Sequence, residues 1–137
     1  MLEHCTLCPR QCGVNRNAGE HGFCGADARI RIGLASLHQW EEPCLSGTNG
    51  AGTVFFCHCP LGCVYCQNHD ISGLDADASG ICTDISGLAD TFLSLQQRGA
   101  HNIDLVTPTQ YAAQLTQAIP LARKRGLTIP IVYIRFV

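Results

Sequence analysis

The chain has little charge, with neither sign in clear excess. Only 15% of its 137 residues are charged, and the formal net charge at pH 7 is -2. A protein this close to neutral has no field that would attract nucleic acid or anionic lipid. We therefore expect neither a nucleic-acid partner nor a membrane partner.

Residues 1–5 lack the features of a secretion signal. They contain no basic stretch followed by an apolar run, and no segment of the chain approaches the roughly 20 apolar residues of a membrane span. We therefore predict a cytoplasmic protein. Thiols are kept reduced in that compartment, so cysteines there are not expected to pair as disulfides.

Aliphatic residues are scarce over residues 1–30, whereas Cys, Gly, Asn and Arg are frequent. Such a stretch cannot form a hydrophobic core of its own, so something else must hold it in place. A bound metal would do this. We predict a cysteine-rich, metal-stapled extension over residues 1–50 and a core domain over residues 51–137.

Cysteine is the residue that the chain has in excess, with ten in all. Their uneven grouping in a reducing compartment favours metal ligation. In the first group, two, three and eleven residues separate successive cysteines, which suffices for one tetrahedral site with four thiolate ligands. Zinc, an accessory iron-sulfur cluster and free thiols are the alternatives for this group. Its members are Cys5, Cys8, Cys12 and Cys24.

Two histidines and two further cysteines lie outside this set. His4 and His21 flank the first group, where either could replace one sulfur, although solvated side chains are the simpler interpretation. Cys44 and Cys82 stand alone and are expected to be small buried residues. Trp40 is likewise expected in the core.

The second cysteine group follows a predicted strand. Residues 53–56 are an apolar run typical of a buried strand, and residues 59–66 form the loop after its carboxyl end, where α/β folds place active sites. Three clustered thiolates leave one coordination position of a metal open for a cofactor. The alternative is a closed site with Cys57 as a fourth ligand, because strand alternation places Cys57 and Cys59 on one face and His58 on the other.

A helix is predicted soon after this loop. Leu88, Phe92 and Leu95 recur at helical spacing. Ser86 is the candidate N-cap, and Gly99 stands where the helix should end.

The elements that follow continue an alternation of strand and helix. Residues 102–107 and 129–134 read as strands, and residues 111–126 carry a second helical stripe with Pro120 as a candidate kink. Residues 29–34 alternate like an edge strand or a hairpin arm. This order is typical of a parallel α/β sheet or barrel.

About three strands and two helices are fewer than a barrel requires. A full (β/α)8 barrel takes about 250 residues. We therefore predict the N-terminal part of a partial (β/α) barrel, in a product truncated or frameshifted from a longer gene. The last residues, 135–137, are expected to end inside an apolar strand.

The spacing of Cys59, Cys63 and Cys66, with the aromatic Tyr65 before the last cysteine, resembles the cluster loop of radical S-adenosylmethionine (SAM) enzymes. The likeness extends over nearly the whole chain. The most specific resemblance is to an uncharacterised branch related to pyruvate formate-lyase activating enzyme. This closer resemblance rests on residues 5–14, 38–43, 66–68 and 106–109.

The resemblance implies a fold, a set of cofactors and an activity. The three cysteines would bind a [4Fe-4S] cluster whose fourth iron is chelated by SAM, giving a 5'-deoxyadenosyl radical that abstracts hydrogen from a substrate. Tyr65 would lie near the adenine. Thr107 and Thr109 stand where the activating enzymes have a Gly-Gly-Glu motif that holds SAM. Their hydroxyls could bind the ligand, or residues 107–109 could form a turn that caps the following helix. No side chain is assigned a catalytic role.

The resemblance also implies partners. A reductant such as flavodoxin or ferredoxin would supply the electron, and a glycyl-radical-type protein could be the substrate. The competing hypothesis is a non-catalytic zinc or iron-sulfur module that serves structure or binding.

Overall fold

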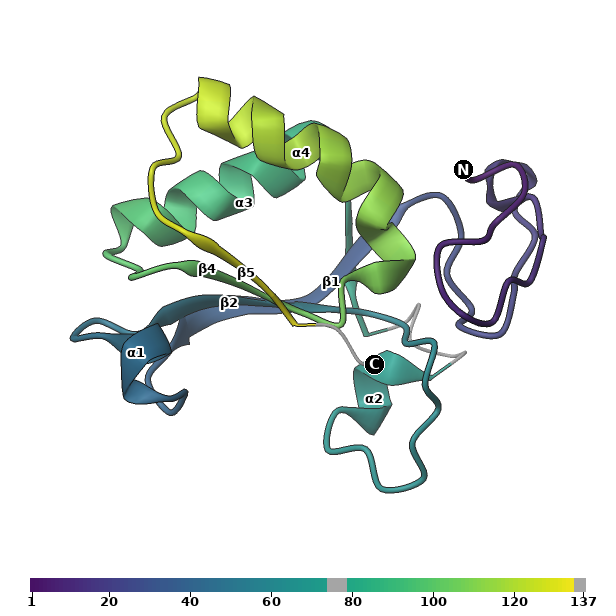
Figure 1. Cartoon of the computed structure of the whole chain (residues 1–137), viewed down its shortest axis with the longest axis horizontal. Helices are drawn as coiled ribbons and strands as arrows, with labels where there is room; N and C mark the ends of the chain where they lie inside the picture. Colours follow the sequence, from purple (N-terminus) through teal and green to yellow (C-terminus); the bar gives the residue numbers. More distant parts are fainter. Residues whose placement is uncertain (74–78, 135–137) are drawn as a thin grey trace.

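The computed structural model describes residues 1–73 and 79–134. These residues form a mixed α/β fold with a five-stranded sheet and four α-helices (Figure 1). The predicted α/β class is therefore confirmed. No helix in the described part of the chain is both long enough and apolar enough to cross a membrane. The strand end predicted at residues 135–137 lies outside the described residues.

Three strands run parallel in one half of the sheet. They are β2 (Ala51–Phe56), β4 (Ile103–Val106) and β5 (Ile131–Ile134), with β4 between the other two. All three were predicted from their apolar runs. Because they are parallel, their carboxyl ends meet at one edge of the sheet, and so do the loops that follow β2 and β4.

The other half of the sheet is antiparallel. Strand β1 (Ile30–His38) pairs with β2 along most of its length, as the predicted hairpin arm should. It is not an edge strand, because β3 (Ile81–Thr83) pairs with Ile30–Ile32 on its outer side. The sheet order is β3-β1-β2-β4-β5. Since β1 belongs to the sheet, only residues 1–29 of the predicted extension precede it.

Two long helices cover one face of the sheet (Figure 1). They are α3 (Ile85–Gln97) and α4 (Ala112–Lys124). The helical stripe predicted for α3 is confirmed, because its apolar side chains are fully buried against the strands. These side chains include Leu88, Phe92 and Leu95, which meet Val54, Phe56, Ile103 and Leu105 in the core.

The ends of α3 follow from local hydrogen bonds. The predicted cap at Ser86 is wrong, because the Asp84 carboxylate accepts the bond from Gly87 N at 2.7 Å and is the N-cap. A carboxylate suits a helix start better than a hydroxyl, since it also meets the positive end of the helix dipole. Gly99 ends the helix as predicted, with φ +92. Helix α4 continues through Pro120.

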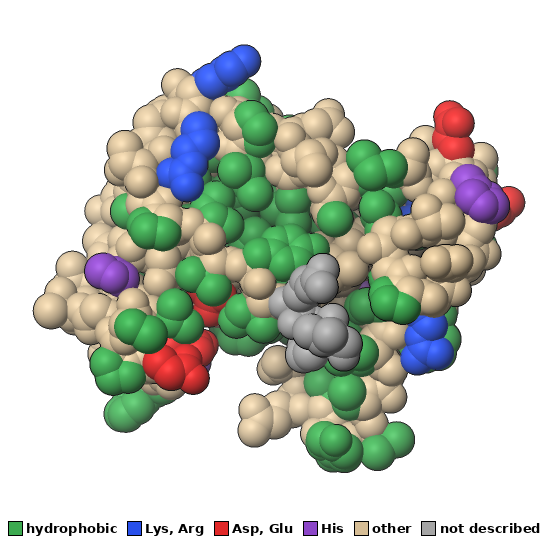
Figure 2. Space-filling model, in the orientation of Figure 1, with side chains coloured by type: hydrophobic (Ala, Val, Ile, Leu, Met, Phe, Trp, Pro, Cys, Tyr) green, Lys and Arg blue, Asp and Glu red, His purple; other side chains and the backbone are tan. Residues whose placement is uncertain are grey.

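The opposite face of the sheet carries the short helices α1 (Pro43–Ser46) and α2 (His69–Ser72) (Figure 1). Residues 1–29 coil beside one end of the sheet. The space-filling view shows Lys and Arg side chains where α4 ends (Figure 2), in agreement with Arg123 and Lys124 in its last turn. The structure thus separates a helix-packed face from one flanked by loops.

Three residues expected inside the protein lie on its surface. Trp40 is 90% exposed, and Cys44 and Cys82 are exposed as well. Trp40 follows the end of β1 and Cys44 lies in the one-turn helix α1, so neither belongs to an element with a buried face. Cys82 lies on the short edge strand β3.

Candidate functional site: two cysteine-lined cavities

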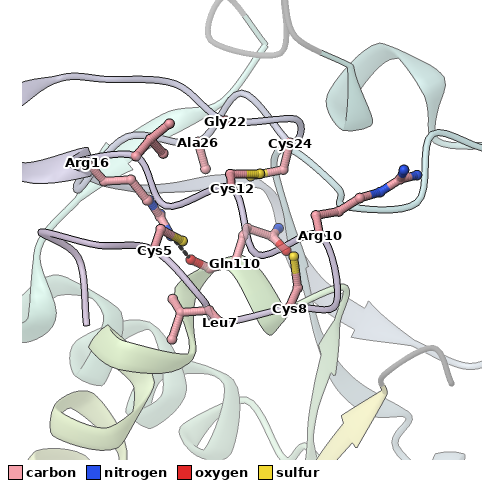
Figure 3. Close-up of a pocket in the computed structure, with 11 residues that line it drawn as sticks. Cys5, Leu7, Cys8, Arg10, Cys12, Arg16, Gly22, Cys24, Ala26 and Gln110 are labelled. Carbon is pink, nitrogen blue, oxygen red and sulfur yellow. Dashed lines mark hydrogen bonds between the residues drawn. The ribbon is translucent and has the colours of Figure 1, made fainter.

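All four cysteines of the first group line one cavity, together with Arg16 and Gln110 (Figure 3). The cavity is small, about 20 Å³. Cys12 is exposed and the other three cysteines are half-buried. Arg10 also borders the cavity, but its guanidinium points away (Figure 3). The fold therefore gathers cysteines that lie up to nineteen positions apart, from Cys5 to Cys24.

The backbone explains how this cavity forms. Cys5 N donates to Val14 O and Gly13 N donates to Cys5 O, each at 3.0 Å, so the first turn closes on itself. Phe23 N donates to Cys12 Sγ at 3.4 Å. Gly22 permits this approach, because a Cβ at that position would lie 2.8 Å from the same sulfur.

Arg16 is the most deeply buried charge beside this cavity, with 1% of its surface exposed. Its guanidinium donates to the backbone oxygens of Asp27 and Gln110, and Nη1 lies 4.0 Å from Cys5 Sγ. Among the described residues, no carboxylate pairs with it. Its positive charge therefore faces carbonyl dipoles, the Tyr111 ring with its centre 5.8 Å away, and the sulfur of Cys5.

Gln110 continues this line of contacts toward the second cysteine group. Its Nε2 donates to Cys57 O at 3.0 Å and to His58 O at 2.8 Å, where the chain leaves β2. The carbonyls of two successive residues are thereby held in place. Arg16 and Gln110 together connect the amino-terminal coil with the start of the second cysteine loop.

A second connection runs through Arg10. Its Nε donates to Pro60 O at 3.1 Å and its Nη2 to Leu61 O at 3.3 Å. The same guanidinium lies 3.7 Å from the centre of the Phe23 ring. The amino-terminal coil therefore packs directly on the loop that carries Cys59 and Cys63.

The second cavity lies at the carboxyl ends of β2 and β4. Cys59, Cys63 and Cys66 line it with Val106 and Thr107, and its volume is about 100 Å³. Cys59 is buried, Cys63 is exposed and Cys66 is half-buried. The three cysteines that resemble a cluster loop thus share one cavity at the edge where parallel sheets bind ligands.

The pKa of the Cys59 thiol depends on its burial and on the other two thiols of the group. Burial raises the pKa of the Cys59 thiol, and the nearby sulfurs of Cys66 and Cys63 raise it further. Backbone N–H groups of Leu61 and Gly62 oppose this rise in pKa, and Leu61 N lies 3.5 Å from Cys59 Sγ. Amide donors aimed at a sulfur favour its thiolate form.

Cys57 does not belong to this set. It is fully buried, yet it is not among the residues that line the cavity. The alternation predicted for residues 57–59 is wrong, because β2 ends at Phe56 and His58 has φ +67, which turns the chain. Cys57, His58 and Cys59 are all buried as a result.

The predicted SAM-binding residues are only partly brought together. Thr107 lines the second cavity with a strained φ of +52. Tyr65 is 87% exposed, and Thr109 lies in the 3-10 turn η3 (Thr109–Tyr111); neither lines the cavity.

No three Cys, His, Asp or Glu side chains in residues 1–73 and 79–134 already converge as metal ligands. The sulfurs line the two cavities without meeting at a common point. Both donor sets are nevertheless soft thiols, which suit zinc and iron-sulfur clusters. Cys12 and Cys63 are exposed, so their side chains have room to rotate inward. Binding would release thiol protons as the sulfurs converge.

Asp104 is a buried acid that the sequence did not reveal. It is fully buried on β4, and neither carboxylate oxygen has a hydrogen-bond partner among the described residues. Burial, and then the negative charge of Glu41, raises the pKa of Asp104 to about 6. Its neighbours Ile103 and Leu105 join the helix-covered core, so alternation places Asp104 on the other face.

Comparison with known proteins gives a partial likeness. No family model matches the chain, and no solved structure matches it. A segment is 41% identical over 75 residues to an uncharacterized protein of Methanocaldococcus jannaschii. The match covers 53% of this chain and spans only 20% of the length of that relative. That relative has no described activity.

Sequence reasoning missed Arg16, Gln110 and Asp104. Arg16 could have been noticed as a cation within a stretch that has few aliphatic residues. No feature of the sequence singles out Gln110 or Asp104, because polar residues at a helix start or within a strand are usually solvated.

Proposed function

We propose that this chain is the cluster-binding part of a radical SAM protein similar to the activating enzymes of glycyl-radical enzymes. Cys59, Cys63 and Cys66 would hold the [4Fe-4S] cluster. The observation that supports this most is their shared cavity with Thr107 at the carboxyl ends of β2 and β4. Parallel α/β folds bind ligands at this edge.

The residues present fit such a cluster better than a closed metal site. Three thiols line the cavity, whereas Cys57 does not. This cavity is the larger of the two, at about 100 Å³ against about 20 Å³. Backbone N–H groups reach Cys59 Sγ, and such bonds tune iron-sulfur clusters. When bound, the cluster and SAM supply the radical chemistry for hydrogen abstraction.

The chain's own residues would position these groups. The Thr107 hydroxyl would hydrogen-bond SAM from the floor of the cavity, and the exposed Tyr65 ring would cover the adenine from the rim. Gln110 would keep the start of the loop fixed through the carbonyls of Cys57 and His58.

The sheet would be one part of a partial (β/α) barrel. In this proposal β2, β4 and β5 line the barrel wall, α3 and α4 form its outer layer, and the face that carries Asp104 is the interior. A flavodoxin-like or ferredoxin-like protein would deliver the electron. A glycyl-radical-type protein is the proposed substrate.

Electron paramagnetic resonance of the anaerobically reconstituted, dithionite-reduced chain tests this proposal. We expect a reduced [4Fe-4S] signal that changes shape when SAM is added. Cys63→Ala should abolish iron uptake, while Cys82→Ala should leave it intact. Both cysteines are exposed, so the second variant is a matched control.

Two results would contradict the proposal. Zinc uptake without iron would favour the non-catalytic metal module. A cluster signal that ignores SAM would show a cluster site without the cofactor pocket, and would remove the case for hydrogen abstraction.

A further inference from the structure

The proposed function leaves the first cysteine cavity unexplained. We propose that one zinc ion binds there as a closed four-thiolate site and holds residues 1–29 together. This inference does not depend on a cluster in the second cavity. The four ligands are Cys5, Cys8, Cys12 and Cys24.

The donor set fits a single ion. Four cysteines line one small cavity of about 20 Å³, in a coil with almost no hydrophobic core. A tetrahedral zinc ion with four cysteine ligands is the usual closed structural site.

The buried positive charge of Arg16 favours a negatively charged group in the cavity. Arg16 is 1% exposed, and no carboxylate within the described residues pairs with it. A buried charge without a counter-charge is costly. Its Nη1 lies 4.0 Å from Cys5 Sγ, so the cysteine sulfurs are the groups placed to carry negative charge. Four thiolates on one divalent zinc retain a net charge of about -2, which Arg16 partly neutralises.

The neighbouring histidines do not take part in the donor set. His21 donates from Nδ1 to Gly25 O at 2.6 Å, and the His4 ring packs against Gly13, where an added Cβ would lie 3.0 Å away. Neither histidine lines the cavity. Phe23 N already points at Cys12 Sγ, as second-layer donors do in metal-thiolate sites. The site is therefore all-sulfur.

Residues 1–29 also need a source of stability other than apolar burial. Among residues 1–29, only Ala26 is a fully buried member of the hydrophobic core. The turns at Cys5 and Gly13 are closed by a few backbone hydrogen bonds, each of which contributes little net stability. A structural zinc couples its binding free energy to folding, which supplies what apolar burial does not.

The test uses the full chain, purified under reducing conditions and loaded with zinc. Elemental analysis should find about one tightly bound zinc per chain. Cys12→Ser should weaken zinc binding by more than about tenfold. Cys44→Ser is the matched control, because Cys44 is an equally exposed thiol outside the cavity. Cys63→Ser should also retain zinc, which separates this site from the second cysteine group.

Cobalt substitution gives a second measurement on the unmodified chain. Tetrahedral thiolate ligation should produce intense sulfur-to-cobalt charge-transfer bands that vanish when zinc is added, even if Cys12→Ser fails to fold. Four results would overturn the inference: no bound zinc, iron with sulfide at the first group, octahedral cobalt bands, or zinc that is lost in Cys63→Ser but kept in Cys12→Ser. None of them decides whether Cys59, Cys63 and Cys66 hold a cluster.

Discussion

The two cysteine groups use the same side chain in different surroundings. The first lies in a coil with almost no hydrophobic core, around a cavity of about 20 Å³, beside the buried cation Arg16. The second lies at the carboxyl edge of parallel strands, around a cavity of about 100 Å³ that includes Thr107. Four sulfurs line the first cavity and three line the second.

This contrast shows that cysteine spacing alone does not decide what a site does. Four sulfurs around a minimal cavity can saturate one ion, which leaves no position for a substrate. Three sulfurs around a larger cavity leave room for a further ligand. The two regions are joined by hydrogen bonds of Arg10, Arg16 and Gln110. A substitution in one region can therefore alter the conformation of the other.

Arg16→Met tests whether the first region depends on its buried cation, and we expect it to have the largest effect. Methionine is similar in length but leaves the backbone oxygens of Asp27 and Gln110 without their donor. We expect a loss of about 3–4 kcal/mol in the free energy of unfolding. Urea denaturation measures it, with the exposed Arg98→Met as control. A loss below about 0.5 kcal/mol, the range of ordinary surface changes, would mean that the guanidinium is dispensable.

Asp104→Asn tests the face of the sheet opposite α3 and α4. The folded-state pKa of about 6 lies above the ordinary 3.8, so the folded chain holds this proton more tightly than the unfolded chain. This carboxyl therefore lowers stability as pH rises from about 4 to about 6, and the cost persists above that. The variant should gain about 2–3 kcal/mol at pH 8 and almost nothing at pH 3.

Thermal unfolding across this pH range measures the effect of Asp104→Asn. Glu3→Gln, at an exposed position, should not alter the pH profile. If Asp104→Asn keeps the slope of the wild-type profile between pH 4 and pH 6, the assignment of that slope to Asp104 is wrong.

Gln110→Leu tests the connection between the two regions. The substitution removes the donor to the carbonyls of Cys57 and His58, and an unsatisfied buried group costs roughly 1–3 kcal/mol. We expect about 2 kcal/mol of destabilisation and faster alkylation of Cys59. Gln117→Leu, on the exposed side of α4, serves as control. Unchanged alkylation would show that the loop does not depend on this contact.

Thr107→Gly tests strain in the second region alone and should have the smallest effect. A β-branched residue at φ +52 is strained, and glycine adopts that conformation freely. We expect stability to rise by about 1 kcal/mol, while any response of the cluster signal to SAM weakens. Chemical denaturation and paramagnetic resonance on one preparation measure both. A loss of stability would indicate that the entropy cost of glycine outweighs the strain relieved.

Much of the fold could be predicted from residue patterns. Apolar runs gave the three parallel strands, and the spacing of Leu88, Phe92 and Leu95 gave the helix that packs on them. These patterns succeed because each buried face has to repeat with the period of its own element. The cap was expected at Ser86 and lies at Asp84, because serine and aspartate both cap helices well and only the hydrogen bond to Gly87 N distinguishes them.

The grouping of the cysteines was also readable, since residues close in sequence tend to share a loop. The sequence by itself determined two thiol clusters, an α/β core and a coil too poor in apolar residues to fold on burial alone. Only the tertiary structure decided that Cys57 lies outside the second cavity and that Arg16 and Gln110 join the two regions. It also decided that Asp104 is buried with no hydrogen-bond partner among the described residues. Those contacts link residues up to 94 positions apart, and no local pattern reports which distant carbonyl a side chain will meet.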